Sequence, residues 1–74
     1  MLEQLKDILV KFTKVNREDI TEKSVLTADL GLSSFDVVSI VTEIEDEFDI
    51  EIPDKDIRKF VTVGDAVDYI EKRR

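Results

Sequence analysis

The sequence predicts an all-α fold, a small four-helix bundle with a long first loop and a short third helix, and three observations carry this prediction. Apolar residues recur at helical spacing in separate segments of the chain. Two segments begin with capping boxes, and no run alternates convincingly between apolar and polar residues as a strand does. With 74 residues, of which 42% are hydrophobic, we expect one domain over residues 1–74 built on one core.

The first helix is expected over residues 2–15. Charged residues separate its apolar residues, which fall at helical spacing: Leu2, Leu5, Ile8, Leu9 and Phe12. From residue 16 to 32 the pattern breaks into polar residues and glycine, with a few apolar residues between them. We therefore predict a long loop held to the core at Ile20, Val25, Leu26 and Leu30.

Ser33 and Asp36 have the spacing of a capping box, so a second helix is expected to begin there. It can run to Phe48, before Ile50-Glu51-Ile52-Pro53 stops it, because proline cannot donate a backbone hydrogen bond. A short third helix is expected over residues 54–60.

Thr62 and Asp65 repeat the capping spacing and predict the start of the last helix. This helix is expected to end in Lys72-Arg73-Arg74, where cations oppose the negative end of the helix dipole.

Composition excludes several classes of function. The chain has no cysteine and no histidine, which rules out disulfides, thiol nucleophiles and imidazole bases. No Asp-x-Asp-x-Asp-Gly loop is present, so no metal site is assigned. The chain has no apolar run of membrane-spanning length and its first residues do not resemble a signal peptide, so we expect a cytoplasmic protein.

The net charge of −7 is concentrated in the middle of the chain, where residues 29–54 contain nine acids and no base. A negative field repels nucleic acids and anionic membranes and attracts proteins with basic patches. The alternative is that the run only keeps the surface soluble. From charge and size we expect a monomer.

A helical wheel divides the second helix into two surfaces. The core-facing residues are Val37, Ile40, Val41, Ile44 and Phe48. Phe35 and Val38 point away from that stripe, on the surface that also carries Ser39, Thr42, Glu45, Asp46 and Asp49. Two large apolar residues on an acidic surface predict a patch that binds a partner. The alternatives are that the long loop covers Phe35, or that these are single exposed apolar residues of the kind common on protein surfaces.

Two serines stand at the predicted start of this helix. Ser33 is accounted for as the cap, whereas Ser34 has no such structural role. At the first helical position its hydroxyl is expected to face solvent beside unpaired amides, where an attached phosphate would be stabilised. The alternative, which the local chemistry does not exclude, is that Ser34 is an unmodified serine in the first turn of a helix.

These residues resemble the signature of a known family. Asp29-Leu30-Gly31-Leu32-Ser33-Ser34-Phe35-Asp36, an apolar helix, and then Glu45-Asp46-Glu47-Phe48-Asp49-Ile50-Glu51-Ile52-Pro53-Asp54 are similar to the acyl carrier proteins. In that family the motif reads Asp-Leu-Gly-x-Asp-Ser-Leu, and the serine three residues after the glycine receives 4′-phosphopantetheine from coenzyme A. Here that serine is Ser34.

The resemblance implies a discrete carrier and not an enzyme. The thiol of the prosthetic group would hold acyl groups as thioesters and deliver them to biosynthetic enzymes, with fatty acid biosynthesis the first expectation. The partners implied are the carrier-protein synthase, which is the phosphopantetheinyl transferase, and acyl-processing enzymes with basic patches. The residues implied to contact them are Asp29, Phe35, Asp36, Val38, Glu43, Glu45 and Asp46.

The family also implies a cavity for the acyl chain between the helices. Its lining by position would be Ile40, Ile44, Ile52, Ile57, Phe60, Ala66 and Tyr69. An apolar bundle core predicts much the same set without any ligand.

Three residues depart from the family pattern: Ser33 replaces an aspartate, Ser39 a glutamate, and Thr42 an apolar residue. These departures favour partners other than those of the housekeeping carrier, so a polyketide or other thioester pathway is the alternative.

An unmodified acidic adaptor protein is a second alternative. A hydrolase using paired carboxylates is disfavoured, because the acids of 43–49 would lie on an open helix surface.

Overall fold

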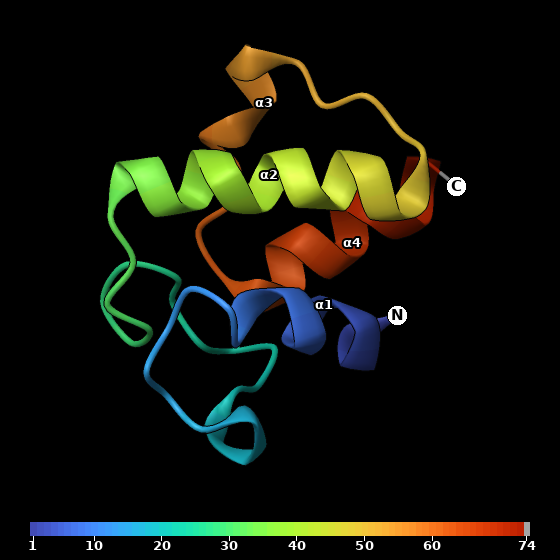
Figure 1. The fold of residues 1–74 in the computed structure, drawn as a ribbon. Helices are drawn as coiled ribbons and strands as arrows, with labels where there is room; N and C mark the ends of the chain where they lie inside the picture. The colour runs from blue at the N-terminus through green and yellow to red at the C-terminus, as the bar shows by residue number, and fades with distance from the viewer. Residues whose placement is uncertain (74) are drawn as a thin grey trace.

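The computed structural model describes residues 1–73, and within them the chain forms four α-helices, one short 3-10 helix and no strand (Figure 1). The elements in order are α1 (Leu2–Leu9), η1 (Arg17–Asp19), α2 (Ser34–Phe48), α3 (Asp54–Ile57) and α4 (Val63–Arg73). This confirms the predicted all-α bundle with a long first loop and a short third helix. Arg74, which was expected to close the last helix, lies outside the described residues. No helix in the described part is long and apolar enough to cross a bilayer.

The longest helix, α2, contacts both α1 and α3, and in the view of Figure 1 α1 and α4 lie on one side of it with α3 on the other. The core takes apolar residues from α1, α2 and α4 and from all three connections between the α-helices. Three of the predicted loop anchors, Ile20, Leu26 and Leu30, are buried in it, and Val25 is half-buried. The first loop is therefore packed onto the helices along much of its length.

Helix α1 is shorter than predicted, since it ends at Leu9 and not near residue 15. After Leu9 the backbone tightens, because the Lys11 and Phe12 amides donate to carbonyls three residues back, at 3.2 and 2.9 Å. The Thr13 hydroxyl then donates to the Leu30 carbonyl at 2.7 Å. This contact with the loop directs the chain away from the helix axis, while Phe12 and Val15 still pack against the core.

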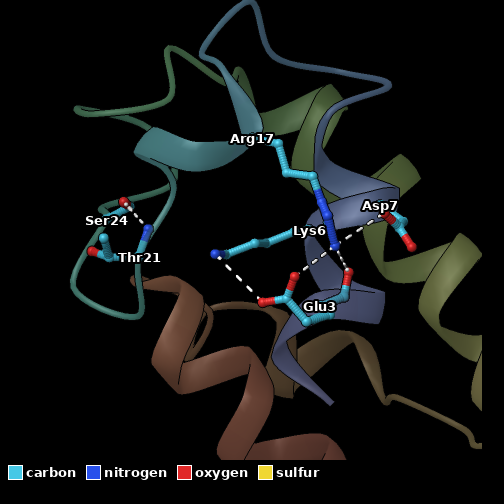
Figure 2. Close-up of polar contacts among 6 residues, drawn as sticks. All are labelled: Glu3, Lys6, Asp7, Arg17, Thr21 and Ser24. Atoms are coloured by element: carbon cyan, nitrogen blue, oxygen red, sulfur yellow. Dashed lines mark hydrogen bonds and ion pairs between the residues drawn. The ribbon is translucent and has the colours of Figure 1, made fainter.

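The short 3-10 helix η1 was not predicted, and Arg17 attaches it to α1. The Arg17 Nη2 group donates to the Glu3 carbonyl and to Glu3 Oε1, both at 2.9 Å, and lies 3.3 Å from Asp7 Oδ1 (Figure 2). Lys6 adds an ion pair to Glu3 at 3.6 Å. Further along the loop, the Thr21 amide donates to Ser24 Oγ at 3.0 Å.

Helix α2 begins and ends where the sequence predicts. The helix ends at Phe48, and Asp49 after it adopts the left-handed backbone conformation with φ of 54°, four residues before Pro53. Both predicted capping boxes are confirmed. At the start of α4 the Asp65 amide donates to Thr62 Oγ1 at 3.1 Å and the Thr62 amide donates to Asp65 Oδ2 at 3.0 Å.

Helix α3 starts at Asp54 as expected but ends at Ile57, three residues before the predicted end. The Lys59 and Phe60 amides donate to carbonyls three residues back, so the chain continues in a tighter turn. This turn places Phe60 in the core, where it is 6% exposed. Val61 can then accept a hydrogen bond from the Leu26 amide at 2.9 Å.

The first loop also meets the start of α4, a contact that the sequence does not indicate. Val25 and Thr62 form an isolated antiparallel bridge, and the Gly64 amide donates to the Glu22 carbonyl at 2.8 Å. A Cβ atom at Gly64 would lie 3.0 Å from that same carbonyl oxygen. Glycine therefore permits the close approach between loop and helix.

Candidate functional site

The start of α2 presents two serines at the surface, directly after a turn that contains Gly31. Gly31 takes a left-handed conformation with φ of 67°, which glycine adopts without the steric cost of a Cβ atom. Leu30 and Leu32 on either side of it are each 4% exposed. Because two buried leucines anchor the turn, Ser33 and Ser34 are held at the protein surface, where both are exposed.

The two serines differ in what they do. Ser33 caps the helix, since its Oγ accepts from the Asp36 amide at 3.2 Å and its own amide donates to Asp36 Oδ2 at 3.0 Å. Ser34 is the first residue of the helix, and it is exposed. The amides of Ser34 and Phe35 are among the first in the helix and have no acceptor one turn back. The helix start therefore offers a reachable hydroxyl next to free donors and the positive end of the dipole.

The exposed apolar residues predicted on α2 are present. Phe35 is 86% exposed and Val38 is 48% exposed, so the first loop does not cover Phe35. Val37, Ile40, Val41 and Ile44 are buried as the wheel predicts, and Phe48 packs against the core while partly exposed. The phenylalanine next to Ser34 is thus available to another molecule.

Two of the predicted contact carboxylates also stabilise the loop and the cap. The Asp29 carboxylate accepts from the Val25 amide at 2.7 Å, which closes a turn in the first loop, and Asp36 belongs to the capping box described above. Both use one oxygen, Oδ2, for these bonds. Asp29 is exposed and Asp36 half-exposed, so each also contributes charge to the surface around Ser34.

The remaining three predicted carboxylates lie further along α2. Glu43 pairs with Lys11 at 3.3 Å, and Glu45 Oε2 accepts from the Ile52 amide at 2.9 Å. Asp46 is exposed, and its carboxylate makes no hydrogen bond or ion pair with residues 1–73. Sequence reasoning predicted the acidic surface but not the structural bonds that Glu43 and Glu45 make.

Two of the three residues that depart from the family pattern, Ser39 and Thr42, lie on α2. Ser39 is exposed, and the Thr42 hydroxyl donates to the Val38 carbonyl at 3.2 Å. In the described part of the chain, no group of three or more acidic, histidine or cysteine side chains is placed to hold a metal ion.

The structure brings the seven residues predicted to line an acyl cavity into the core. Ile40, Ile44, Ile52, Phe60 and Ala66 are buried, and Ile57 and Tyr69 pack against them while partly exposed. The rings of Phe60 and Tyr69 meet edge to face, with centroids 5.2 Å apart. An open hollow of about 810 Å³ lies nearby, and of the seven only Tyr69 lines it. Most of its lining is charged, with residues from the α2–α3 connection, Lys59 and the outer face of α4.

Sequence reasoning missed one ionisable residue, Asp56 of α3, which is 4% exposed. The Tyr69 hydroxyl donates to Asp56 Oδ2 at 2.6 Å, Arg73 Nη2 lies 3.4 Å from the same oxygen, and Lys59 Nζ lies 3.2 Å from Oδ1. The only sequence signal was the spacing of Tyr69 and Arg73, four residues apart on one helix face. It does not indicate which acid they meet.

These contacts shift two pKa values in opposite directions. The hydrogen bond from Tyr69 holds the pKa of Asp56 below its ordinary value of 3.8, assisted by Lys59 and Arg73 and opposed by burial. Burial, together with the hydrogen bond to Asp56, raises the pKa of Tyr69 above 10.0. At neutral pH the pair is therefore an ionised carboxylate and a neutral phenol.

Comparison with known proteins shows the family of this chain. A family model described as "Phosphopantetheine attachment site" matches residues 3–70. The chain is 42% identical to an acyl carrier protein of Wolinella succinogenes over 74 residues, covering 100% of this chain and 97% of that one. It is 43% identical to an acyl carrier protein of Clostridium perfringens over 70 residues, covering 95% and 92%. The chain belongs to the acyl carrier protein family.

A solved structure supports the same assignment. It comes from work on the thermal stability of the acyl carrier protein from Enterococcus faecalis, and it superposes with a TM-score of 0.85 at 36% identity. The match covers 99% of this chain and 92% of that one. The start of α2 fits the phosphopantetheine group that the description of the family model names. Ser34 is exposed, and the helix start beside it can accommodate an anionic phosphodiester.

Proposed function

We propose that this protein carries acyl groups as thioesters on a 4′-phosphopantetheine arm, which a phosphopantetheinyl transferase attaches from coenzyme A to Ser34. The observation that carries the proposal is the exposed Ser34 at the first position of α2, where the family motif expects the modified serine. The bound group would supply the thiol that a chain without cysteine lacks. The protein itself performs no catalysis in this proposal.

The residues of the turn would prepare Ser34 for this attachment. Ser33 occupies the capping position and satisfies the Asp36 amide, which leaves the Ser34 hydroxyl unconstrained by the helix. The amides of Ser34 and Phe35 would face the phosphodiester, and the positive end of the α2 dipole would favour its negative charge.

The partner surface in this proposal is the exposed face of α2 and the turn before it. Phe35 and Val38 offer apolar contact area, and the acids around them would attract basic patches on the transferase and on acyl-processing enzymes. We further propose a monomeric cytoplasmic protein whose residues 1–74 form one carrier domain. Fatty acid biosynthesis is the first pathway we assign, with a specialised polyketide or other thioester pathway as the alternative that Ser33, Ser39 and Thr42 favour.

Coexpression with a broad-specificity phosphopantetheinyl transferase, followed by intact-protein mass measurement, tests the proposal. The wild-type chain is expected to gain one prosthetic-group increment and Ser34→Ala none. Ser39→Ala is the matched control, because Ser39 is an exposed serine of the same helix, and this variant is expected to be modified normally. An unmodified wild-type chain that still binds a basic partner would instead support the acidic adaptor.

A further inference from the structure

Asp56 is the only acidic or basic side chain buried among the described residues. It belongs to α3, a helix of four residues, which is too short to be stable without tertiary contacts. Burying an ionised carboxylate is costly unless charged or hydrogen-bonding partners surround it. The position of Asp56 therefore depends on the groups that it meets, and those groups in turn fix the position of α3.

Two of the three partners come from α4. Tyr69 and Arg73 both reach Asp56 Oδ2, while Lys59, just after α3, reaches Oδ1. The partners also support one another, since the Arg73 guanidinium carbon lies 4.4 Å from the centre of the Tyr69 ring, a cation–π contact. We call Asp56, Lys59, Tyr69 and Arg73 the Asp56 latch.

The latch stands between the charged hollow and the apolar core. Lys59, Tyr69 and Arg73 line the hollow of about 810 Å³, and Ile57 and Phe60, next to Asp56 in the chain, pack into the core on the other side. The proposed acyl-cavity residues are packed together in this structure. An acyl chain entering among Ile57, Phe60 and Tyr69 would have to displace these side chains, and because the Tyr69 hydroxyl donates to Asp56, this displacement would strain the latch.

We propose that the Asp56 latch positions α3 against α4 and so limits how readily the carrier encloses the acyl chain of its own thioester. The inference rests on the proposed function, because it needs an acyl group attached through Ser34. The acyl chain exchanges between solvent, where partner enzymes can reach it, and the core, and a closed latch makes this equilibrium less favourable to entry. Weakening the latch shifts that equilibrium toward the enclosed chain.

The first arm of the test uses the unmodified protein and amide hydrogen exchange. Tyr69→Phe removes one hydrogen bond and keeps the ring, and Asp56→Asn removes the charge. In both variants the Lys59 and Phe60 amides, which bond to carbonyls of α3, are expected to lose about fivefold or more of their protection. Unchanged protection at these amides would overturn the latch.

The second arm compares octanoyl-loaded protein with holo protein of the same variant, so that differences in basal stability cancel. In Tyr69→Phe and Asp56→Asn the rise in Tm on octanoyl loading is expected to exceed the wild-type rise by about 4 °C or more, because less must be broken to admit the chain. An equal or smaller rise would overturn the proposal.

The matched control is Arg17→Gln, which breaks the Glu3 and Asp7 contacts of η1 and lowers stability without touching the latch. On octanoyl loading, the Tm of this variant is expected to rise by the same amount as the Tm of the wild type. An enlarged rise in this control would overturn the proposal by showing that any destabilised variant responds alike. Failure of Ser34 to take the prosthetic group, seen first by mass, would overturn the proposed function and this inference together, while the exchange arm would still report whether the latch positions α3.

Discussion

Individual carboxylates on α2 have different roles according to whether a backbone amide lies within reach. Glu45 binds the amide of Ile52, a buried residue of the α2–α3 connection, whereas Asp46 next to it is exposed. The sequence predicts both acids as surface residues, because charge and helical spacing are all that it reveals. The bond to Ile52 depends on the path of the connection after Asp49, which local patterns do not determine.

Replacing these two neighbours separates structural from surface roles. Glu45→Ala is expected to lower stability by about 1–3 kcal/mol, because it leaves the Ile52 amide without its acceptor. Asp46→Ala is expected to change stability by less than about 0.5 kcal/mol and to slow modification of Ser34 by a transferase with a basic surface. Thermal melts and modification rates of the two variants check this. Equal loss of stability in both would contradict the assignment.

At the scale of elements, helix starts were predictable and helix ends were less so. Ser33 and Thr62 cap their helices through side chains that lie within four residues, so short-range spacing is sufficient to find them. The ends of α1 and α3 depend on distant partners, namely the Leu30 carbonyl that Thr13 meets and the core site that Phe60 fills. Asp56 was missed for the same reason, because its partners Tyr69 and Arg73 lie on another helix.

The attachment of α3 makes a prediction about pH. The pKa of Asp56 is lower in the folded chain than in the unfolded chain, so its contribution to stability is present above about pH 4 and is lost as the pH falls through the folded value. Asp56→Asn is therefore expected to be less stable than wild type at neutral pH, with a gap that narrows on acidification below about pH 4. Melting curves of both proteins across this range check the prediction. A gap that stays constant into acid would count against it.

At the scale of the whole molecule, the sequence shows which segment carries the negative charge, and the structure shows which elements that segment forms. The acidic segment 29–54 contains the turn, α2 and the α2–α3 connection, so the charge surrounds Ser34 and extends along α2. The first loop, by contrast, pairs with the start of α4 through Val25 and Thr62. That pairing joins residues far apart in the sequence, so no local sequence pattern predicts it.

The uneven charge predicts a strong response to salt. Nine acids within 26 consecutive residues and no base among them repel one another, and the ion pair of Glu43 with Lys11 offsets only part of this. Added salt or millimolar divalent cations are expected to raise the Tm by about 4–8 °C, the shift that about 1 kcal/mol produces in a domain of this size. Calorimetry at low and high ionic strength tests this expectation, and a flat response would refute the picture of clustered repulsion.

The most direct measurement fragments the modified protein and locates the prosthetic group between the two adjacent serines. The fold assigns Ser33 to the helix cap and leaves Ser34 exposed at the first helical position. Tandem mass spectrometry of the peptide that contains both residues is expected to place the whole increment on Ser34, in the wild type and in Ser33→Ala. An increment on Ser33, or none on either serine, would contradict the account.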